Sequence, residues 1–393
     1  MVALNVPLTR SRDGVALVFL LNGIFFSTLV SRLPDIRHAL SLSDAQLGGL
    51  LLAGGIGAVL GTPLAGGLVG RLGRAGVVRF CSIGCATALV VWALGATALH
   101  SLPVTIAAEF AYGFIVNIWD VAQNVEAAAV ERGIGKTLMP RFHAAWSIGS
   151  ICGGAVGVPM TAWHVPVFLH ACGAIVIVLT GVWWASRTFL PEVEHERVEH
   201  ARAARSAWLE RRTLLVGLMA LTFASVEGIA NDWLSLGIID GYHTAHWVGV
   251  GGFWLFTLSM TAGRIFGTNA IDAWGRAATM WGCAVAAAVG VLLTVFGGSL
   301  AVVVVGIVMW GLGGSLGFPV GMSAASDGDP SRAASRVAVV STISYTAFLL
   351  FPPVIGWLGN EWGTLHALLV VAGLMVPGAL AVFAVRAQPA ADA

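Results

Sequence analysis

Asp120 is an acidic residue inside an otherwise apolar stretch of the chain, which runs from Tyr112 to Glu126. Residues three and four apart share a face of a helix, so Asn117 and Asn124 would form one polar stripe with Asp120. A carboxylate at the centre of a membrane-spanning helix costs about 2.5–3.5 kcal/mol on insertion scales, and by default it marks a pathway for protons, ions or substrate. The stripe therefore predicts such a pathway. The alternative is that Asp120 only forms hydrogen bonds between helices.

Two further titratable side chains could take part in proton exchange. His143 follows after one short loop, where it could reach the depth of Asp120 and pair with it, or could only cap the next helix. Glu227 and Asn231 lie one helical turn apart in a later apolar segment, and both would point into the same cavity if the two halves of the chain pack as repeats. The predicted proton-coupling residues are therefore Asp120, Glu227 and His143.

Amide and aromatic side chains near these acids could bind a solute. Central cavities that hold polar organic molecules combine a few polar groups with aromatic faces. The predicted substrate-binding residues are Asn22, Asn117, Trp119, Asn124, Trp146, Asn231, Asp232, Trp233 and Tyr345. For each of them the alternative is ordinary packing or hydrogen bonding between helices, and for Trp233 a place in the aromatic belt of the membrane interface.

Composition places the chain in a lipid bilayer. Of its 393 residues, 57% are hydrophobic and 10% are charged, whereas soluble proteins carry about 25% charged residues. The net charge is +1 and no basic cluster is interleaved with aromatic side chains, which excludes a nucleic-acid partner. The five cysteines lie in apolar segments without a disulfide or zinc spacing, so neither a metal nor a cofactor is predicted. No Gly-Lys-Ser/Thr sequence follows the Gly-rich runs, which argues against a nucleotide-driven pump.

Apolar segments of about 20 residues, the length that crosses a bilayer, recur twelve times along the chain. We place them near residues 14–33, 45–69, 77–99, 103–127, 140–162, 166–188, 212–235, 246–268, 277–297, 299–324, 334–358 and 363–386. The predicted fold class is an all-α membrane protein of twelve transmembrane helices. Its predicted domains are an N-terminal six-helix bundle at 1–190, a cytoplasmic linker at 191–211 and a C-terminal six-helix bundle at 212–393.

Basic residues fix the orientation, because cytoplasmic loops carry the excess of Lys and Arg. With both termini in the cytoplasm, only Arg32 and Arg37 of the 21 lysines and arginines fall outside. Charged pairs at the cytoplasmic helix ends would hold one conformation and release another. The residues predicted to form this cytoplasmic gate are Arg71, Arg74, Glu126, Arg141, Arg264, Asp272, Arg276 and Arg336.

One loop pattern occurs twice in the chain. Residues 66–74 follow the second predicted helix, and residues 268–276 follow the eighth. Both resemble the Gly-x-x-x-Asp-Arg-x-Gly-Arg loop of the major facilitator superfamily. The first copy has Gly70 in place of the family's Asp, and the second has Thr268 for Gly and Ala273 for Arg. The resemblance implies the fold of that family, in which two six-helix repeats alternate access to a site near the membrane midplane.

A longer resemblance covers essentially the whole chain. Four runs are similar to the YbjJ-type bacterial inner-membrane members of the superfamily: residues 120–132, 227–233, 310–319 and 323–327. That group lies near the fucose:proton symporter branch, whose acidic-x-Ala-x-Asn pattern is matched by Asp120, Ala122 and Asn124. The acid carries a proton in that branch, so the resemblance implies this role for Asp120. Fucose symporters have a second acid where this chain has Val30, so fucose itself is not the expected substrate.

These features together predict proton-coupled symport of a small polar organic solute, sugar-like or a related metabolite, by alternating access. The chain would be a multi-pass protein of the bacterial inner membrane and not an enzyme. Two alternatives remain open, a proton-driven antiporter that exports a metabolite or drug and a membrane sensor that transports nothing. The expected partners are the solute, protons and the lipid bilayer, and a monomer is expected.

Overall fold

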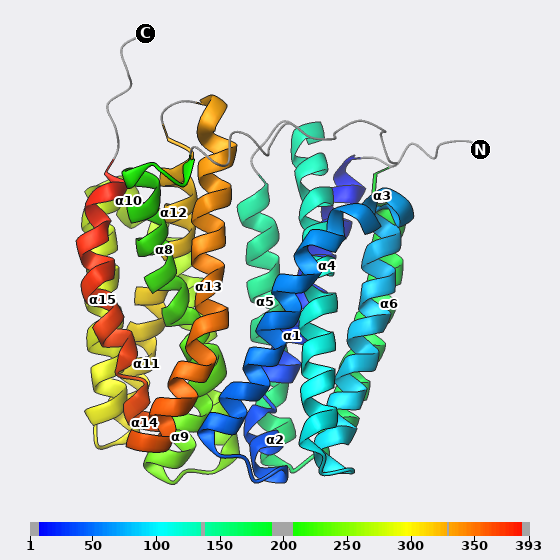
Figure 1. Ribbon diagram of the computed structural model, residues 1–393, viewed down its shortest axis with the longest axis vertical. Coiled ribbons are helices and arrows are strands. Elements are labelled where there is room, and N and C mark those ends of the chain that lie inside the picture. Colours follow the sequence, from blue (N-terminus) through cyan, green and yellow to red (C-terminus); the bar gives the residue numbers. More distant parts are fainter. Residues whose placement is uncertain (1–7, 135–137, 191–206, 328–329, 387–393) are drawn as a thin grey trace. The chain divides into compact units, whose positions relative to one another are not determined.

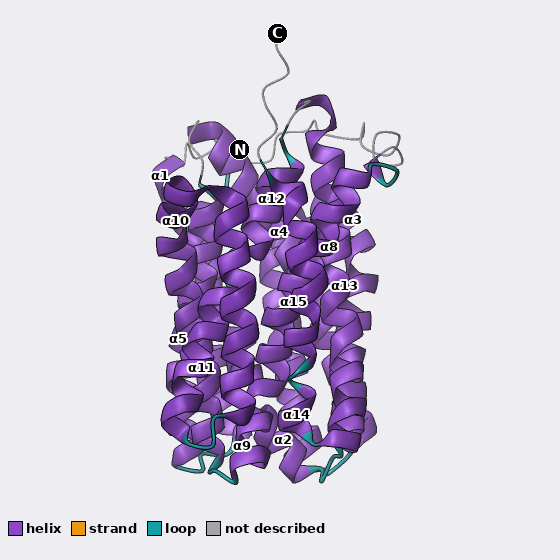
Figure 2. Cartoon of the chain, turned by 90° about the vertical axis from the view of Figure 1, so that its left-hand side faces the viewer, coloured by secondary structure: helices purple, strands orange, loops and turns teal. Residues whose placement is uncertain are grey.

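The computed structural model describes residues 8–134, 138–190, 207–327 and 330–386, which form helices joined by short loops (Figures 1 and 2). No strand occurs among these described residues. The first half contains α1 (Leu8–Val30), α2 (Leu33–Ala39), α3 (Asp44–Thr97), α4 (Leu102–Ile134), α5 (Met139–Ala162), α6 (Val167–Ala185) and the 3-10 turn η1 (Ser186–Thr188). The second half contains α8 (Arg211–Ile229), the π-helical turn η2 (Ala230–Leu234), α9 (Ser235–Tyr242), α10 (His246–Phe296), α11 (Leu300–Gly314), α12 (Gly317–Ala325), α13 (Pro330–Trp362), α14 (Thr364–Ala367), α15 (Val370–Ala381) and the 3-10 turn η3 (Val382–Val385).

Nine helical stretches in the described part of the chain are long and apolar enough to cross a membrane. Two of these stretches, α3 and α10, each consist of two helices that meet at a glycine kink. When these two are divided at their kinks and the 24-residue α5 is added, the described chain has the twelve spans that the sequence predicts.

The two kinks have the same backbone cause. Gly73 in α3 has a φ of 73° and Gly275 in α10 has a φ of 81°. With ψ of 159° and 161°, both lie in a backbone region that is essentially limited to glycine and costs other residues about 1–3 kcal/mol. Both glycines lie in the two copies of the loop pattern, so the internal repeat of the sequence corresponds to a repeated turn of the backbone.

Several helices end at other residues than predicted. α1 covers Leu8–Val30, whereas the prediction was 14–33, and α4 continues to Ile134, whereas the predicted span ended at 127. Hydropathy marks the part of a helix that lies in lipid, and a helix can continue beyond it. The extended end of α4 is tied to α5, because one Glu131 carboxylate oxygen accepts hydrogen bonds from the backbone N–H groups of Leu138 and Met139, at 2.6 Å each.

The chain forms two compact units. The first unit contains Met1–Glu194 and Thr244–Trp254, and the second contains His195–His243 and Leu255–Ala393. In the first unit α3 packs on α4, and α1 packs on α5 and α6. In the second, α8 packs on α13, α15 and α12. Residues 191–206 of the predicted linker lie outside the described residues, so the predicted domain boundaries stay a prediction.

The first residue of α10 belongs to the first unit. His246 places its Nδ1 atom 3.0 Å from a carboxylate oxygen of Asp35 in α2. The other Asp35 oxygen accepts a hydrogen bond of 2.8 Å from Arg32, which also donates to Thr161 and to the backbone carbonyl of Val165. Arg32 is thereby buried at this end of the unit and held through its two terminal nitrogens, while its Nε–H group has no partner among the described residues.

Candidate substrate and proton site

A chain of hydrogen bonds in the first unit connects α5, α1 and α4. The Trp146 indole N–H donates to the side-chain oxygen of Asn22 at 2.9 Å, and the Asn22 amide donates to Oδ1 of Asp120 at 3.1 Å. Gln123, one turn further along α4, donates to the same carboxylate oxygen at 2.9 Å. The side chains that donate hydrogen bonds to the Asp120 carboxylate in the described part of the chain are therefore neutral amides.

Glycines bring α1 and α5 close enough for this contact. A Cβ atom added to Gly23 of α1 would collide with the backbone carbonyl of Trp146, and one added to Gly149 of α5 would collide with the carbonyl of Leu20. Small residues at such crossings allow membrane helices to touch through their backbones. Asn22 directly precedes Gly23, so this helix crossing sets the distance between the side chains of Asn22 and Trp146.

Aromatic rings surround the hydrogen-bonded chain. Phe26 packs on Trp146 with ring centroids 5.2 Å apart, and Phe25 lies edge-on to Trp119 at 6.2 Å. Trp119 is fully buried, and its indole N–H has no hydrogen-bond partner among the described residues. Trp146 is only half-buried. Of the two tryptophans predicted to bind substrate, Trp146 therefore has the indole that joins the polar network.

The other predicted residues of the first unit occupy different surroundings. The Asn117 side-chain oxygen accepts a hydrogen bond of 2.8 Å from Thr62 of α3, and the Asn124 amide donates to the backbone carbonyl of Asp120 at 2.8 Å. His143 is exposed, and its ring lies edge-on to Phe19 at 5.3 Å. The residue that sequence reasoning missed is Gln123. The sequence could have indicated Gln123, because its three-residue spacing from Asp120 also places it on the same helix face.

The second unit holds an ion pair between α8 and α10. Glu227 lies 2.8 Å from Arg264, and both side chains are mostly buried. Arg264 also donates to the backbone carbonyl of Ser315, beside the junction of α11 and α12. The structure thus joins two residues that the sequence analysis assigned to different roles, proton coupling for Glu227 and the cytoplasmic gate for Arg264.

Three predicted substrate-binding residues of the second unit lie in the π-helical turn η2. Asn231 and Trp233 are buried, whereas Asp232 is half-buried. Single π-helical turns inside α-helices often occur at functional sites. Because Trp233 is completely buried in the unit, it does not lie in an aromatic belt at the lipid interface. Tyr345 of α13 is 58% exposed, with its ring between those of Phe318 and Phe348.

Charged contacts occur at the cytoplasmic end of the first unit. Arg74, which follows the Gly73 kink, lies 3.1 Å from the buried Glu126 of α4. Both residues also form hydrogen bonds with the backbone of Leu190. Arg74 donates to its carbonyl at 3.2 Å, and Glu126 accepts from its N–H group at 2.7 Å. Two other predicted gate residues, Arg71 and Arg141, are exposed.

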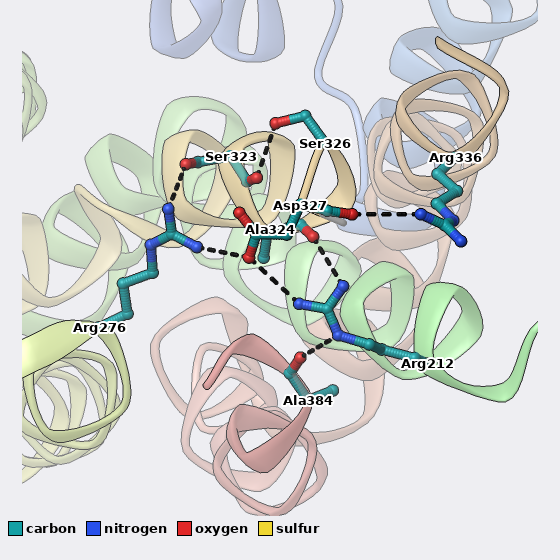
Figure 3. Close-up of polar contacts among 8 residues, drawn as sticks. All are labelled: Arg212, Arg276, Ser323, Ala324, Ser326, Asp327, Arg336 and Ala384. Atoms are coloured by element: carbon teal, nitrogen blue, oxygen red, sulfur yellow. Dashed lines mark hydrogen bonds and ion pairs between the residues drawn. The ribbon is translucent and has the colours of Figure 1, made fainter. Parts of the chain in front are cut away.

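The second unit has a related cluster at its cytoplasmic end (Figure 3). Asp327, which follows α12, accepts from Arg276 at 2.7 Å and from Arg212 at 3.2 Å. Arg336 pairs with Glu210 at 2.6 Å and also donates to the Asp327 backbone carbonyl. Arg74 and Arg276 therefore share one arrangement, in which the arginine after a glycine kink pairs with an acid near the cytoplasmic end of a packed helix.

Two features of this cluster differ from the sequence analysis. Asp327 was not among the predicted gate residues, although it stood in one of the runs that carry the resemblance. Asp272, which was predicted, is exposed on α10. The internal repeat of the sequence could have predicted Asp327. When Arg276 is matched with Arg74, Asp327 corresponds to Glu126 of the first half.

Residues 15–244 match the family model described as Major Facilitator Superfamily, which is more than half of the chain. The chain belongs to this superfamily. It is 31% identical over 361 residues to the uncharacterized transporter y4wD of Sinorhizobium fredii, a match that covers 92% of this chain and 94% of the relative. The predicted family is thereby confirmed at the level of the superfamily.

Solved structures share the fold. A mutant of the nucleoside transporter NupG matches with a TM-score of 0.78 at 15% identity, covering 96% of this chain and 99% of that one. A bacterial homologue of the human lysosomal transporter Spinster matches with a TM-score of 0.72 at 13% identity, covering 98% and 99%. The predicted all-α fold of a major facilitator is confirmed. This superfamily member is a multi-pass membrane protein and a secondary transporter rather than an enzyme.

Proposed function

We infer that this major facilitator couples the transmembrane proton gradient to the movement of a small polar organic solute, by symport, with Asp120 as the proton carrier. The observation that carries the proposal is the surroundings of the Asp120 carboxylate. Its partners are the amides of Asn22 and Gln123, and no cation pairs with it in the described part of the chain. A charged group inside a membrane protein is costly, and such groups by default mark a pathway for protons, ions or substrate.

A proton carrier has to gain and lose its charge during each cycle. Asp120 can accept a proton without breaking an ion pair, because amide donors remain tolerable partners of a neutral acid. The buried acids Glu126 and Glu227 have arginine partners instead, so protonation of either would leave a cation without its counter-charge. Glu227 is the proposed coupling acid of the second unit, where release of Arg264 would accompany its protonation.

The solute is proposed to bind beside the hydrogen-bonded chain of the first unit. Trp146 offers an aromatic face next to the Asn22 amide and the Asp120 carboxylate, a combination suited to a polar organic molecule. Asn117, Trp119 and Asn124 remain further candidates on the same helix. Asn231, Asp232, Trp233 and Tyr345 are the candidates of the second unit. We propose a monomer in the bacterial inner membrane as the working form.

Substitution of Asp120 by Asn tests the proposal. The variant keeps the size of the side chain and loses the exchangeable proton, so accumulation of solute against its gradient should fall to the level of downhill equilibration. The measurement is solute uptake with simultaneous proton flux in proteoliposomes, over a panel of sugars, polyols, amino acids and drugs. Asp13→Asn is the matched control, because Asp13 is 68% exposed and, within the described part of the chain, pairs with Arg12 alone.

Each outcome of this experiment has a distinct meaning. Wild-type accumulation by the Asp120→Asn variant would exclude Asp120 as the proton carrier. Proton flux opposite in direction to the solute flux would replace symport by antiport. Absence of flux with every compound, in protein that is folded, would favour the sensor.

His143 is proposed as a second site of proton exchange. Histidine is the side chain whose unperturbed pKa lies closest to physiological pH, which suits it to proton exchange. The His143→Gln variant should therefore transport with an altered pH dependence, measured as initial uptake rate from pH 5 to pH 8. A pH profile that superimposes on that of the wild type would remove His143 from the mechanism and leave Asp120 in place.

A further inference from the structure

A cleft of about 380 Å³ opens on the second unit, where the α10 kink meets the end of the last helix. Its lining contains two arginines among otherwise small or apolar residues: Ile271, Trp274, Gly275, Arg276, Ala277, Ala278 and Arg386. All of these residues belong to one unit, and both arginines lie at its cytoplasmic end. Of the lining residues, the proposed transport mechanism uses only Arg276, which is predicted to belong to the cytoplasmic gate.

Arg386 is held in the cleft by aromatic rings. Its guanidinium lies 4.8 Å from the ring centre of Phe383 and 5.7 Å from that of Trp281. Trp281 is itself fixed, because its indole N–H donates to the backbone carbonyl of Ala379 at 2.9 Å. Arg386 is exposed and has no carboxylate partner among the described residues. Stacking orients the guanidinium plane and leaves its N–H groups available to an anion.

The surroundings of the cleft carry an excess of positive charge. Arg276 pairs with Asp327, but Asp327 is shared with Arg212, as Figure 3 shows. Asp272 lies one helical turn before Arg276 and is exposed. Among the described residues, the three arginines Arg212, Arg276 and Arg386 face two carboxylates even if Asp272 is counted, and Arg336 and Glu210 offset each other. The cleft is therefore suited to an anionic ligand.

Apolar side chains next to the cleft indicate which class of anion binds there. Trp274, a lining residue, is 73% exposed, and Phe383 of η3, which packs against Arg386, is 54% exposed. In a membrane protein such rings contact acyl chains, and exposed Trp is typical of the headgroup level. Basic pockets on the cytoplasmic side of membrane helices bind anionic headgroups. We propose that this cleft binds the headgroup of an anionic phospholipid, with Arg386 and Arg276 at its phosphate.

The first unit provides an internal comparison. A smaller cleft of about 260 Å³ lies beside the equivalent loop and is lined by Pro63, Leu64, Gly67, Leu68 and Arg71. It has one arginine where the cleft of the second unit has two, so it should bind the same lipid more weakly.

The test measures lipid retention by the purified full-length protein. Native mass spectrometry after incubation with equal amounts of phosphatidylglycerol and phosphatidylcholine should show preferential retention of phosphatidylglycerol. Arg386→Gln should weaken that retention about fivefold, the effect expected for one arginine at an anionic membrane surface. Arg187→Gln, at another exposed cytoplasmic position, should retain lipid like the wild type, and Arg71→Gln should have a smaller effect than Arg386→Gln.

Three results would overturn the proposal. The first is equal retention of the two lipids, and the second is equal phosphatidylglycerol retention by the wild type and the folded Arg386→Gln variant. The third is displacement of phosphatidylglycerol by inorganic phosphate at millimolar concentration, which would identify a site for a soluble anion. Folding of each variant is checked by its thermal unfolding in phosphatidylcholine. The Arg386→Lys variant gives a second readout, because it keeps the positive charge and loses the planar stacking on the aromatic rings.

Discussion

Asn22 uses both ends of its amide, and this makes it the link between α5 and α4. Its oxygen accepts from Trp146 and its nitrogen donates to Asp120. The side chain is buried, so loss of either partner would leave a polar group without compensation. A single neutral residue thus determines how the aromatic wall is placed relative to the carboxylate.

A double-mutant cycle between Asn22 and Trp146 measures this link. Asn22→Ala and Trp146→Phe each remove the hydrogen bond, so their effects should be less than additive by about 1 kcal/mol. The measurement is unfolding of the purified protein by titration with sodium dodecyl sulfate. Trp119→Phe is the control, because the Trp119 N–H has no partner among the described residues. Additive effects of Asn22→Ala and Trp146→Phe would contradict the link.

Sequence reasoning found three of the four members of this hydrogen-bonded chain but not their order, and it missed Gln123. Asn22, Asp120 and Trp146 were all predicted, because a polar side chain in an apolar span is rare and conspicuous. Spacing alone could not choose Gln123 over Asn124, since residues three and four apart both share the face of Asp120. The contacts of Asn117 with Thr62 and of Glu227 with Arg264 depend on which helices pack together, and a single sequence does not contain that information.

At the scale of the elements, glycine has two separate uses in this protein. Gly23 and Gly149 let α1 and α5 touch, whereas Gly73 and Gly275 turn the backbone between two spans. The repeated loop of the sequence contains Gly73 and Gly275, but the sequence analysis predicted neither the α1–α5 crossing nor the two backbone turns. Hydropathy also predicted some helix ends at the wrong residue. The cytoplasmic end of α4 is set by the Glu131 hydrogen bonds to α5 rather than by hydropathy.

Substitution of Gly275 by Ala isolates the backbone cost of the α10 kink. A Cβ atom added at Gly275 would meet nothing within 4 Å, so only its φ of 81° opposes the change. We expect a loss of about 1–3 kcal/mol in the free energy of unfolding. Gly282→Ala is the matched control, because it also lies in α10 with nothing within 4 Å but has helical backbone angles. That control should be neutral or should stabilise the helix by up to about 1 kcal/mol. Equal effects of the two substitutions would show that φ is not the cause.

At the scale of the whole molecule, charge and repeat are the two patterns that the sequence revealed most reliably. The only two basic residues predicted on the outer side, Arg32 and Arg37, are each paired with an acid, Asp35 at 2.8 Å and Asp44 at 2.7 Å. Their charge is therefore offset where the positive-inside rule would disfavour it. The rule depends only on loops and spans, which explains why it could be applied before any contact was known.

Labelling of single cysteines tests the twelve-span orientation as a whole. Ser299 is exposed between the second part of α10 and α11, and Ser326 is exposed after α12, on the opposite side of the next span. In a background with the five native cysteines replaced by Ala, Ser299→Cys should react with a membrane-impermeant maleimide on intact cells. Ser326→Cys should react only after permeabilisation. Because both changes are Ser→Cys at exposed positions, a difference in labelling reports sidedness rather than reactivity. Labelling of Ser326→Cys in intact cells, or of both variants alike, would contradict a cytoplasmic N-terminus followed by ten spans before this position.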